Sequence, residues 1–223
     1  MDSHNLIVIE GLDGSGKATQ TMLLRDHIIK EGHCVRLISF PNYGETSAAL
    51  VKSYLSGEFG SSPDSVNAYA ASSFYAVDRY AAYKKHWESD YLRGVNILAD
   101  RYTTSNTVYQ MTKLPRGQWH EYLRWLEDYE YRLLELPAPD IVLYLDMAPE
   151  ISQKLMSKRY EGQENRKDIH EIDISFQLRC RESALFSAEV LGWHVIRCFE
   201  GSQPRTIDEI SAEIWQTVKD TLI

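Results

Sequence analysis

The sequence is poor in the features that mark several large classes of protein. Its 223 residues include only three cysteines and seven prolines. The cysteines Cys34, Cys180 and Cys198 are odd in number and lack the paired spacing of a metal site, which indicates a reducing compartment, the cytoplasm. Internal repeats, low-complexity segments and Pro-rich linkers are also missing. The sequence therefore predicts a single domain over residues 1–223.

Long apolar runs and an excess of positive charge are missing as well. No stretch approaches the roughly 20 apolar residues of a membrane-spanning helix. The polar start and the short apolar run after it do not form a signal peptide. The formal net charge of −8 argues against a nucleic-acid surface, so an anionic ligand must be gathered by a local cluster of Arg and Lys. We expect neither a membrane nor a nucleic acid as a partner.

What the sequence does contain is a glycine-rich segment between two regular patterns. The apolar run at residues 6–9 predicts a buried strand, and residues 19–30 carry apolar side chains at helical spacing. A strand, a glycine turn, a lysine and a helix form the context in which G-x-x-x-x-G-K binds phosphate. We expect the nucleotide-binding segment to consist of Gly11, Leu12, Asp13, Gly14, Ser15, Gly16, Lys17, Ala18 and Thr19.

The residue types of this segment suit phosphate chemistry, with one departure. The glycines let the backbone N–H groups point inward, the helix N-terminus adds partial positive charge, and Lys17 supplies a full charge. The motif normally continues with Ser or Thr, whose hydroxyl contacts Mg²⁺, but here Ala18 follows the lysine. Thr19 cannot replace that hydroxyl, because one residue along a helix rotates the side chain by about 100°. We expect water, phosphates and carboxylates to hold Mg²⁺ instead.

Strand and helix patterns alternate along the rest of the chain. Strands are predicted at residues 34–40, 95–100, 140–146 and 193–199, and helices at 47–56, 64–87, 119–134, 149–160, 169–191 and from the capping box at 206–209. This alternation is typical of an α/β fold whose parallel sheet is covered by helices on both faces. In such sheets, ligands bind beyond the carboxyl ends of the strands.

Two pairs of residues in this pattern have both a functional and a structural interpretation. Asp100 and Arg101 end a strand, where a carboxylate suits Mg²⁺ and an arginine suits phosphate, or where the two form a structural ion pair. Tyr75 and Arg79 share a helical face and could enclose a base, but spacing alone favours a stacked surface pair. The aromatic stripe at residues 119–134 indicates core or a dimer interface. The charged residues 161–168 indicate a mobile loop.

Taken in order, these motifs resemble the thymidylate kinase family of P-loop nucleoside monophosphate kinases over nearly the whole chain. The motifs are Glu10-Gly11-Leu12-Asp13, Phe40-Pro41-Asn42-Tyr43, Tyr75-Ala76-Val77-Asp78-Arg79 and Asp100-Arg101-Tyr102-Thr103-Thr104-Ser105-Asn106-Thr107-Val108-Tyr109-Gln110. The resemblance implies a three-layer P-loop kinase fold with a five-stranded parallel sheet and a mobile lid at about residues 157–170. It further implies a homodimer that phosphorylates dTMP to dTDP with ATP and Mg²⁺, serving dTTP synthesis.

The resemblance also implies roles for the matching residues around the acceptor nucleotide. Tyr75 would stack on thymine, Arg79 would donate to its O4, and Ser105 and Asn106 would lie near its N3 edge. Tyr109 would pack beneath the deoxyribose, where a 2′-hydroxyl would clash. The remaining acceptor residues would be Phe40, Pro41 and Tyr43, which line the pocket, and Arg101, which grips the acceptor phosphate.

On the donor side, the resemblance implies a lid that covers the ATP phosphates with Arg159, Arg166 and Lys167. Many family members carry an arginine in the P-loop, but here that place holds Gly14, so the catalytic arginine should come from the lid. The expected catalytic set is Lys17, Asp13, Arg101, Arg159 and Arg166, and the expected metal-binding carboxylates are Asp13 and Asp100. The alternatives are a kinase of another (deoxy)nucleoside monophosphate, or a nucleotide-binding protein with weak or no turnover, for which Ala18 is the hint.

Overall fold

The computed structural model describes residues 5–159 and 174–222. Five parallel strands form one sheet in the order β2-β3-β1-β4-β5. They are β1 (Leu6–Gly11), β2 (Val35–Ser39), β3 (Asn96–Asp100), β4 (Ile141–Asp146) and β5 (His194–Arg197). The predicted α/β class and the five-stranded parallel sheet are therefore confirmed. Most of the predicted lid, at residues 160–170, lies outside the described residues.

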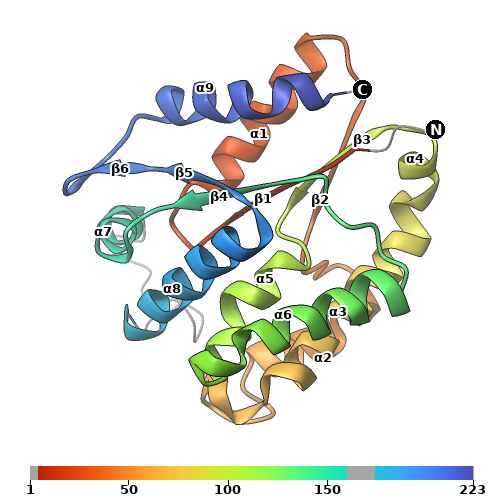
Figure 1. Cartoon of the computed structure of the whole chain (residues 1–223), viewed down its shortest axis with the longest axis vertical. Coiled ribbons are helices and arrows are strands. Elements are labelled where there is room, and N and C mark those ends of the chain that lie inside the picture. Colours follow the sequence, from red (N-terminus) through yellow and green to blue (C-terminus); the bar gives the residue numbers. More distant parts are fainter. Residues whose placement is uncertain (1–4, 160–173, 223) are drawn as a thin grey trace.

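Helices connect the strands and cover both faces of the sheet (Figure 1). They are α1 (Lys17–Lys30), α2 (Ala49–Leu55), α3 (Ala68–Ala82), α4 (Glu88–Leu92), α5 (Thr104–Tyr109), α6 (Trp119–Glu127), α7 (Pro149–Arg159), α8 (Ile174–Leu191) and α9 (Ile207–Val218). Figure 1 shows α1 and α9 on one face and α5 and α8 on the other. Short 3₁₀ turns, two π-helical turns and a small hairpin, β6 (Phe199–Glu200) with β7 (Gln203–Pro204), are the other regular elements of the described chain.

The position of β1 at the centre of the sheet explains the continuous apolar run at residues 6–9. Successive side chains of a strand point to opposite faces of the sheet. Leu6 and Val8 accordingly join the core on the α8 side, whereas Ile7 and Ile9 join the core beneath α1 and α9, and all four are fully buried. A strand covered on both faces needs apolar residues at every position rather than at alternate ones.

Two predicted helices differ from the observed ones. The helix expected at residues 64–87 is divided into a 3₁₀ turn (Pro63–Ser65), α3 and a π-helical turn (Tyr83–Trp87). The break before α3 follows from Asn67, which is extended and caps the helix by accepting a hydrogen bond from the Ala70 N–H. The helix expected at 119–134 ends as a second π-helical turn, η6 (Asp128–Leu133). Its aromatic residues Trp119 and Tyr122 are buried, which confirms the core interpretation.

The parallel arrangement brings three loops to one edge of the sheet. The glycine-rich loop follows β1, Phe40 follows β2, and Arg101 follows β3. Within the described ranges, none of the helices has the length and apolarity needed to span a bilayer.

Candidate active site

The glycine-rich loop has the backbone geometry that its sequence predicts. Gly14 and Gly16 have φ angles of 76° and 91°, a region that other residues rarely adopt. A Cβ atom on Gly11 would lie 2.6 Å from the Ser15 Oγ and 3.0 Å from the Leu145 carbonyl oxygen, so this position has no room for a side chain. Helix α1 begins at Lys17, two residues earlier than expected.

Lys17 lies almost buried at the base of this loop. Its Nζ donates a 2.9 Å hydrogen bond to the Leu12 carbonyl oxygen and lies 3.7 Å from the Asp13 Oδ1. Burial lowers the pKa of Lys17, and the positive charge of Arg101 lowers it further. An anion bound in the loop would offset both effects, which makes the ammonium well placed to meet phosphate.

Arg101 stands at the end of β3 in a left-handed backbone conformation, with a φ of 67°. Such strain in a non-glycine residue clusters at functional sites. Its guanidinium donates to the Asp13 Oδ1 at 2.5 Å, to the Tyr109 hydroxyl at 3.1 Å and to the Glu10 Oε1 at 3.4 Å. Burial acts to lower the pKa of Arg101, but Tyr109 and the two carboxylates outweigh it and raise the pKa well above its ordinary value.

Asp100 does not form the structural ion pair that was an alternative for Asp100 and Arg101, because the ion pairs of Arg101 go to Asp13 and Glu10. The Asp100 Oδ1 is buried and has no hydrogen-bond partner within the described residues. A buried carboxylate oxygen in this state fits a donor for a metal ion or for its water. In the same part of the chain, no cluster of three or more His, Cys, Asp or Glu side chains is arranged to hold a metal.

A cavity of about 280 Å³ lies beside the loop and contains Asp13 in its wall. All nine residues predicted to bind the acceptor line this cavity: Phe40, Pro41, Tyr43, Tyr75, Arg79, Arg101, Ser105, Asn106 and Tyr109. They come from the ends of β2 and β3, from α3 and from α5. The fold therefore brings together residues that are up to 69 positions apart in the sequence, from Phe40 to Tyr109.

Arg79 is not the surface residue that spacing alone favoured. It shares one face of α3 with Tyr75, as predicted, but only 1% of its surface is exposed. Its Nε and Nη2 donate to the Glu130 Oε2 and Oε1 at 2.7 and 2.5 Å. Burial acts to lower the pKa of Arg79, but the Glu130 carboxylate outweighs it and raises the pKa above the ordinary value.

Helix α5 contributes two polar residues to the same wall. The Ser105 hydroxyl donates to the Glu10 Oε2 at 2.6 Å. The Asn106 Nδ2 donates to the Glu130 Oε1 at 3.0 Å and to the Ser72 carbonyl oxygen at 3.3 Å. Both side chains are thus held from behind by buried carboxylates.

Sequence reasoning assigned no role to the three buried carboxylates that hold this site, Glu10, Asp78 and Glu130. A signal existed for Glu10, because a charged residue in an otherwise apolar strand needs a partner. Asp78 accepts from the Asn42 N–H at 2.8 Å and from the Ser47 hydroxyl at 2.7 Å, so it ties the loop after β2 to α3. Glu130 lies in the π-helical turn, where a pattern of 3.6 residues per turn does not apply.

The predicted lid residues are not placed by the structure. Arg159 is the last residue of α7, and its side chain is not described. Arg166 and Lys167 lie outside the described residues. The roles of these three residues stay predictions.

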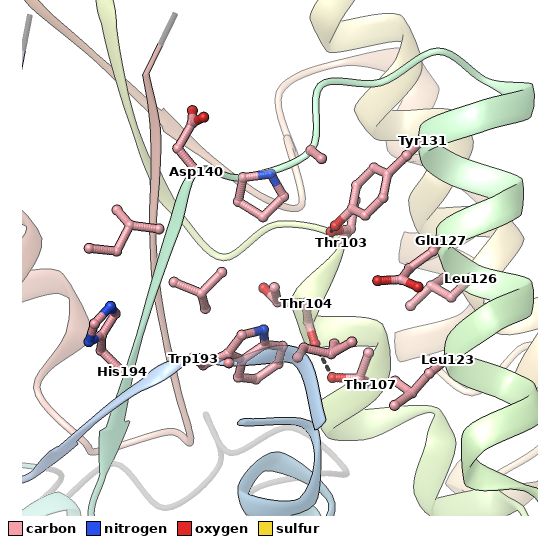
Figure 2. Close-up of a pocket in the computed structure, with 16 residues that line it drawn as sticks. Thr103, Thr104, Thr107, Leu123, Leu126, Glu127, Tyr131, Asp140, Trp193 and His194 are labelled. Carbon is pink, nitrogen blue, oxygen red and sulfur yellow. Dashed lines mark hydrogen bonds between the residues drawn. The ribbon is translucent and has the colours of Figure 1, made fainter. Parts of the chain in front are cut away.

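A second cavity, of about 220 Å³, lies between the starts of β4 and β5 and the helical segments α5 and α6 (Figure 2). Asp140 and His194 stand at the starts of β4 and β5, whereas the glycine-rich loop follows the end of β1. Figure 2 shows Thr103 and Tyr131 on the wall toward α5 and η6. No residue of the glycine-rich loop lines this cavity, so it is distinct from the phosphate site.

Comparison with known proteins identifies the family. The model of the thymidylate kinase family matches residues 9–203. A thymidylate kinase of Mycobacterium tuberculosis is 32% identical over 177 residues, which cover 78% of this chain and 81% of the relative. A thymidylate kinase of Ruegeria pomeroyi is 28% identical over 212 residues, which cover 95% and 93% of the two chains.

A solved structure of thymidylate kinase from Candida albicans has the same fold, with a TM-score of 0.70 and 22% identity. The match covers 98% of this chain and 92% of the Candida protein. The glycine-rich loop and the cavity beside it are therefore set in the fold of a known kinase, and the match to the family model covers most of the sequence. The chain belongs to the thymidylate kinase family and is a nucleoside monophosphate kinase.

Proposed function

We propose that dTMP binds in the cavity of about 280 Å³ and that the P-loop, residues 11–17, holds ATP beside it. As a member of the thymidylate kinase family, the chain phosphorylates dTMP to dTDP with ATP. The observation that carries the site assignment is that all nine expected acceptor residues line one cavity, whose wall includes the P-loop residue Asp13. We also propose that residues 1–223 form one domain.

The acceptor would lie with its base between α3 and α5 and its phosphate at Arg101. Arg79 presents N–H donors to this cavity, and thymine carries a carbonyl acceptor at O4. Arg101 is charged and planar, which suits two-point binding of a phosphate. Tyr109 lies against the Arg101 guanidinium, with 5.2 Å from the guanidinium carbon to the ring centroid, and would pack beneath the deoxyribose.

The donor side would depend on the P-loop and on cations that neutralise the β- and γ-phosphates. Lys17 is a cation that the structure places at the loop. Arg159, Arg166 and Lys167 would add positive charge from the lid. When bound, Mg²⁺ supplies further neutralisation of these phosphates. Asp100 fits as its carboxylate because the buried Oδ1 lacks a partner, whereas the Asp13 Oδ1 already accepts from Arg101.

Transfer needs alignment and charge neutralisation rather than covalent catalysis. Arg101 would hold the acceptor phosphate in line with the γ-phosphate, and Lys17 would stabilise charge on the transferred group. No general base is required, because the acceptor phosphate is already ionised at neutral pH.

We also propose that the chain acts in the cytoplasm as a homodimer. All three cysteines are free thiols, in keeping with a reducing compartment. Large apolar side chains are exposed on neighbouring helices, Leu50 on α2 and Val77 and Tyr80 on α3, where a second copy could cover them. Sedimentation equilibrium measures the assembly, and a monomer at micromolar concentration would contradict it.

An acceptor panel tests the proposed activity. ADP release is measured with ATP, Mg²⁺ and one of dTMP, dUMP, dCMP, dGMP or UMP. We expect dTMP to give the highest kcat/KM. A rate with dTMP no higher than that with ATP alone would contradict the proposed reaction, and a higher kcat/KM for another acceptor would contradict the assigned substrate.

A further inference from the structure

Glu130 stands directly behind the part of the cavity that would contact the base. It is fully buried and lies on η6, the π-helical turn after α6. It does not line the cavity, but both of its carboxylate oxygens accept hydrogen bonds from residues that do, namely Arg79 and Asn106. One carboxylate therefore holds two groups that face the same ligand.

The pairing with Glu130 determines how Arg79 is presented. The Nε and Nη2 atoms meet the two carboxylate oxygens side by side, which is the bidentate geometry of arginine and carboxylate. A more distant bond runs from Nη1 to the Tyr102 carbonyl oxygen at 3.4 Å. The guanidinium plane is therefore fixed, and its remaining N–H groups are the ones that can reach a ligand. Arg79 can only donate, so this position demands an acceptor.

The same carboxylate determines how the Asn106 amide is turned. Its Nδ2 faces the Glu130 Oε1 and the Ser72 carbonyl oxygen, and both of these atoms can only accept. The reversed amide would place Oδ1 against two acceptor oxygens and lose both hydrogen bonds. The amide orientation follows from this network, which leaves Oδ1 as the atom that can accept from a ligand.

We propose that Glu130 is a positioning residue that sets the choice of pyrimidine, an inference that rests on the proposed base site. By holding Arg79 and Asn106 together, it makes the cavity present a donor beside an acceptor. Thymine and uracil offer the complementary edge, an acceptor at O4 and a donor at N3–H. Cytosine offers the reverse, a donor at N4 and an acceptor at N3, so it should be rejected.

The surroundings of the π-helical turn keep this carboxylate in place. Tyr131, the next residue, points inward and its hydroxyl forms a hydrogen bond with the Thr103 Oγ1, just before α5 (Figure 2). Arg79 lies on α3 and Asn106 on α5, so Glu130 links the turn to both helices that carry the side chains proposed to contact the base. The π-helical turn is wider than an α-helical turn, which allows the consecutive residues Glu130 and Tyr131 both to point inward.

Glu130→Gln is the decisive variant, because it changes a group that can only accept into one that also donates. The Glu130 Oε1 accepts from both Arg79 and Asn106, and Oε2 accepts from Arg79, so the nitrogen of the new amide must face an N–H of Arg79 in either orientation. The bidentate pairing is then broken, and the Arg79 guanidinium and the Asn106 amide are no longer held in one arrangement toward the base. We expect the dTMP-to-dCMP ratio of kcat/KM to fall by about 10-fold or more, since mismatched hydrogen bonds account for discrimination of up to about 10⁴.

Two further readouts and two further variants separate positioning from general damage. The KM for ATP and the dTMP-to-UMP ratio should stay within about twofold of the wild type, because Glu130 touches neither the P-loop nor Tyr109. Glu127→Gln is the matched control, since Glu127 is exposed one turn earlier on the same helical segment and should leave every ratio unchanged. Glu130→Asp keeps the charge but is one methylene shorter, so it should lower the dTMP-to-dCMP ratio in the same direction and by less.

The design also covers a folding defect and a wrong site assignment. Glu130→Gln leaves the buried Arg79 without its carboxylate partner, which can destabilise the fold. If this variant does not fold, the dTMP-to-dCMP ratio of Glu130→Asp is the test of the proposal. In the wild type, the Asn106 side-chain amide protons should exchange slowly by NMR, with and without dTMP, and fast exchange would overturn the proposal without any variant. An unchanged dTMP-to-dCMP ratio in the folded Glu130 variants would also overturn it. Arg79→Lys, measured in parallel, separates the role of Glu130 from the assignment of the base site. If only Arg79→Lys lowers the dTMP-to-dCMP ratio, the positioning role of Glu130 is wrong and the base site stands. If no variant changes the ratio, the assignment of the base site is wrong as well.

Discussion

The Nη2 of Arg101 lies 2.5 Å from the Oδ1 of Asp13, so the guanidinium proposed for the acceptor phosphate is joined to the P-loop. The same guanidinium reaches Glu10, a buried carboxylate at the end of β1. These two contacts tie the end of β3 to the loop after β1. The proposed binding places for the acceptor phosphate and for ATP are therefore held in one rigid unit, which suits a transfer that depends on alignment.

Replacing Lys17 by Ala should abolish most turnover and leave the fold intact. The Lys17 ammonium carries a full positive charge at the P-loop. Loss of a comparable group that stabilises a transition state typically lowers the rate by about 10²–10³. ADP release and circular dichroism measure the two effects. Lys30→Ala, at the exposed end of the same helix, is the control and should behave as the wild type. Near-normal turnover of Lys17→Ala would remove the P-loop from the mechanism.

Replacing Tyr109 by Ala should weaken discrimination between deoxyribonucleotide and ribonucleotide. The ring lies against Arg101 in the cavity wall and would pack beneath the proposed sugar position. We expect the dTMP-to-UMP ratio of kcat/KM to fall by about 10-fold or more, since a difference of one small group in a fitted pocket is worth about 1–3 kcal/mol. The dTMP-to-dCMP ratio should change much less, because the base groups are untouched. Ile207→Ala, exposed at the start of α9, serves as the control. A constant dTMP-to-UMP ratio would place sugar selection elsewhere.

Only one of the three thiols should react quickly in the folded protein. Cys34 is exposed, whereas Cys180 and Cys198 are buried. Burial raises the pKa of the Cys198 thiol to about 12 and that of Cys180 further, so at pH 8 neither supplies appreciable thiolate. Titration with a disulfide reagent should modify one thiol per native chain and three in guanidinium chloride. Cys34→Ser should reduce the native count to zero, and fast reaction of a second thiol in the native protein would argue against the buried positions.

Lys113 should make the free energy of unfolding depend on pH in the alkaline range. Burial lowers the pKa of Lys113 to about 8, although its Nζ donates to the Tyr54 hydroxyl and to the Val66 carbonyl oxygen. The unfolded lysine titrates near 10.4, so between these values the unfolded chain binds more protons and stability rises with pH. The contribution of Lys113 to the free energy of unfolding is therefore least favourable below pH 8, where the lysine is charged in both states.

The variant Lys113→Met removes this titration. We therefore expect the free energy of unfolding of the wild type to rise relative to that of the variant as the pH increases from 7.5 to 9.5. Urea denaturation at fixed temperature measures the difference. A difference that stays constant across this range would show that Lys113 titrates in the folded protein as it does in water.

Much of the fold could be predicted because its signals are local. The five strands appear as short apolar runs, and the capping box at the start of α9 is present with Thr206 and Glu209 bonded reciprocally. The P-loop is contiguous, so the order of its residues already contains the turn, the cation and the helix start. The limits of α3 and α6 were less predictable, because π-helical turns follow both helices and change the spacing.

By itself, the sequence determined the class of fold, and it predicted the phosphate-binding loop and, through the family resemblance, the residues proposed to meet the acceptor. Only the tertiary structure decided which charges are paired. The spacing of Arg79 favoured a surface residue, yet its partner Glu130 lies 51 positions away and both are buried. The reason is physical: backbone conformation is governed by neighbours along the chain, whereas a buried charge requires a partner that packing brings from elsewhere in the chain.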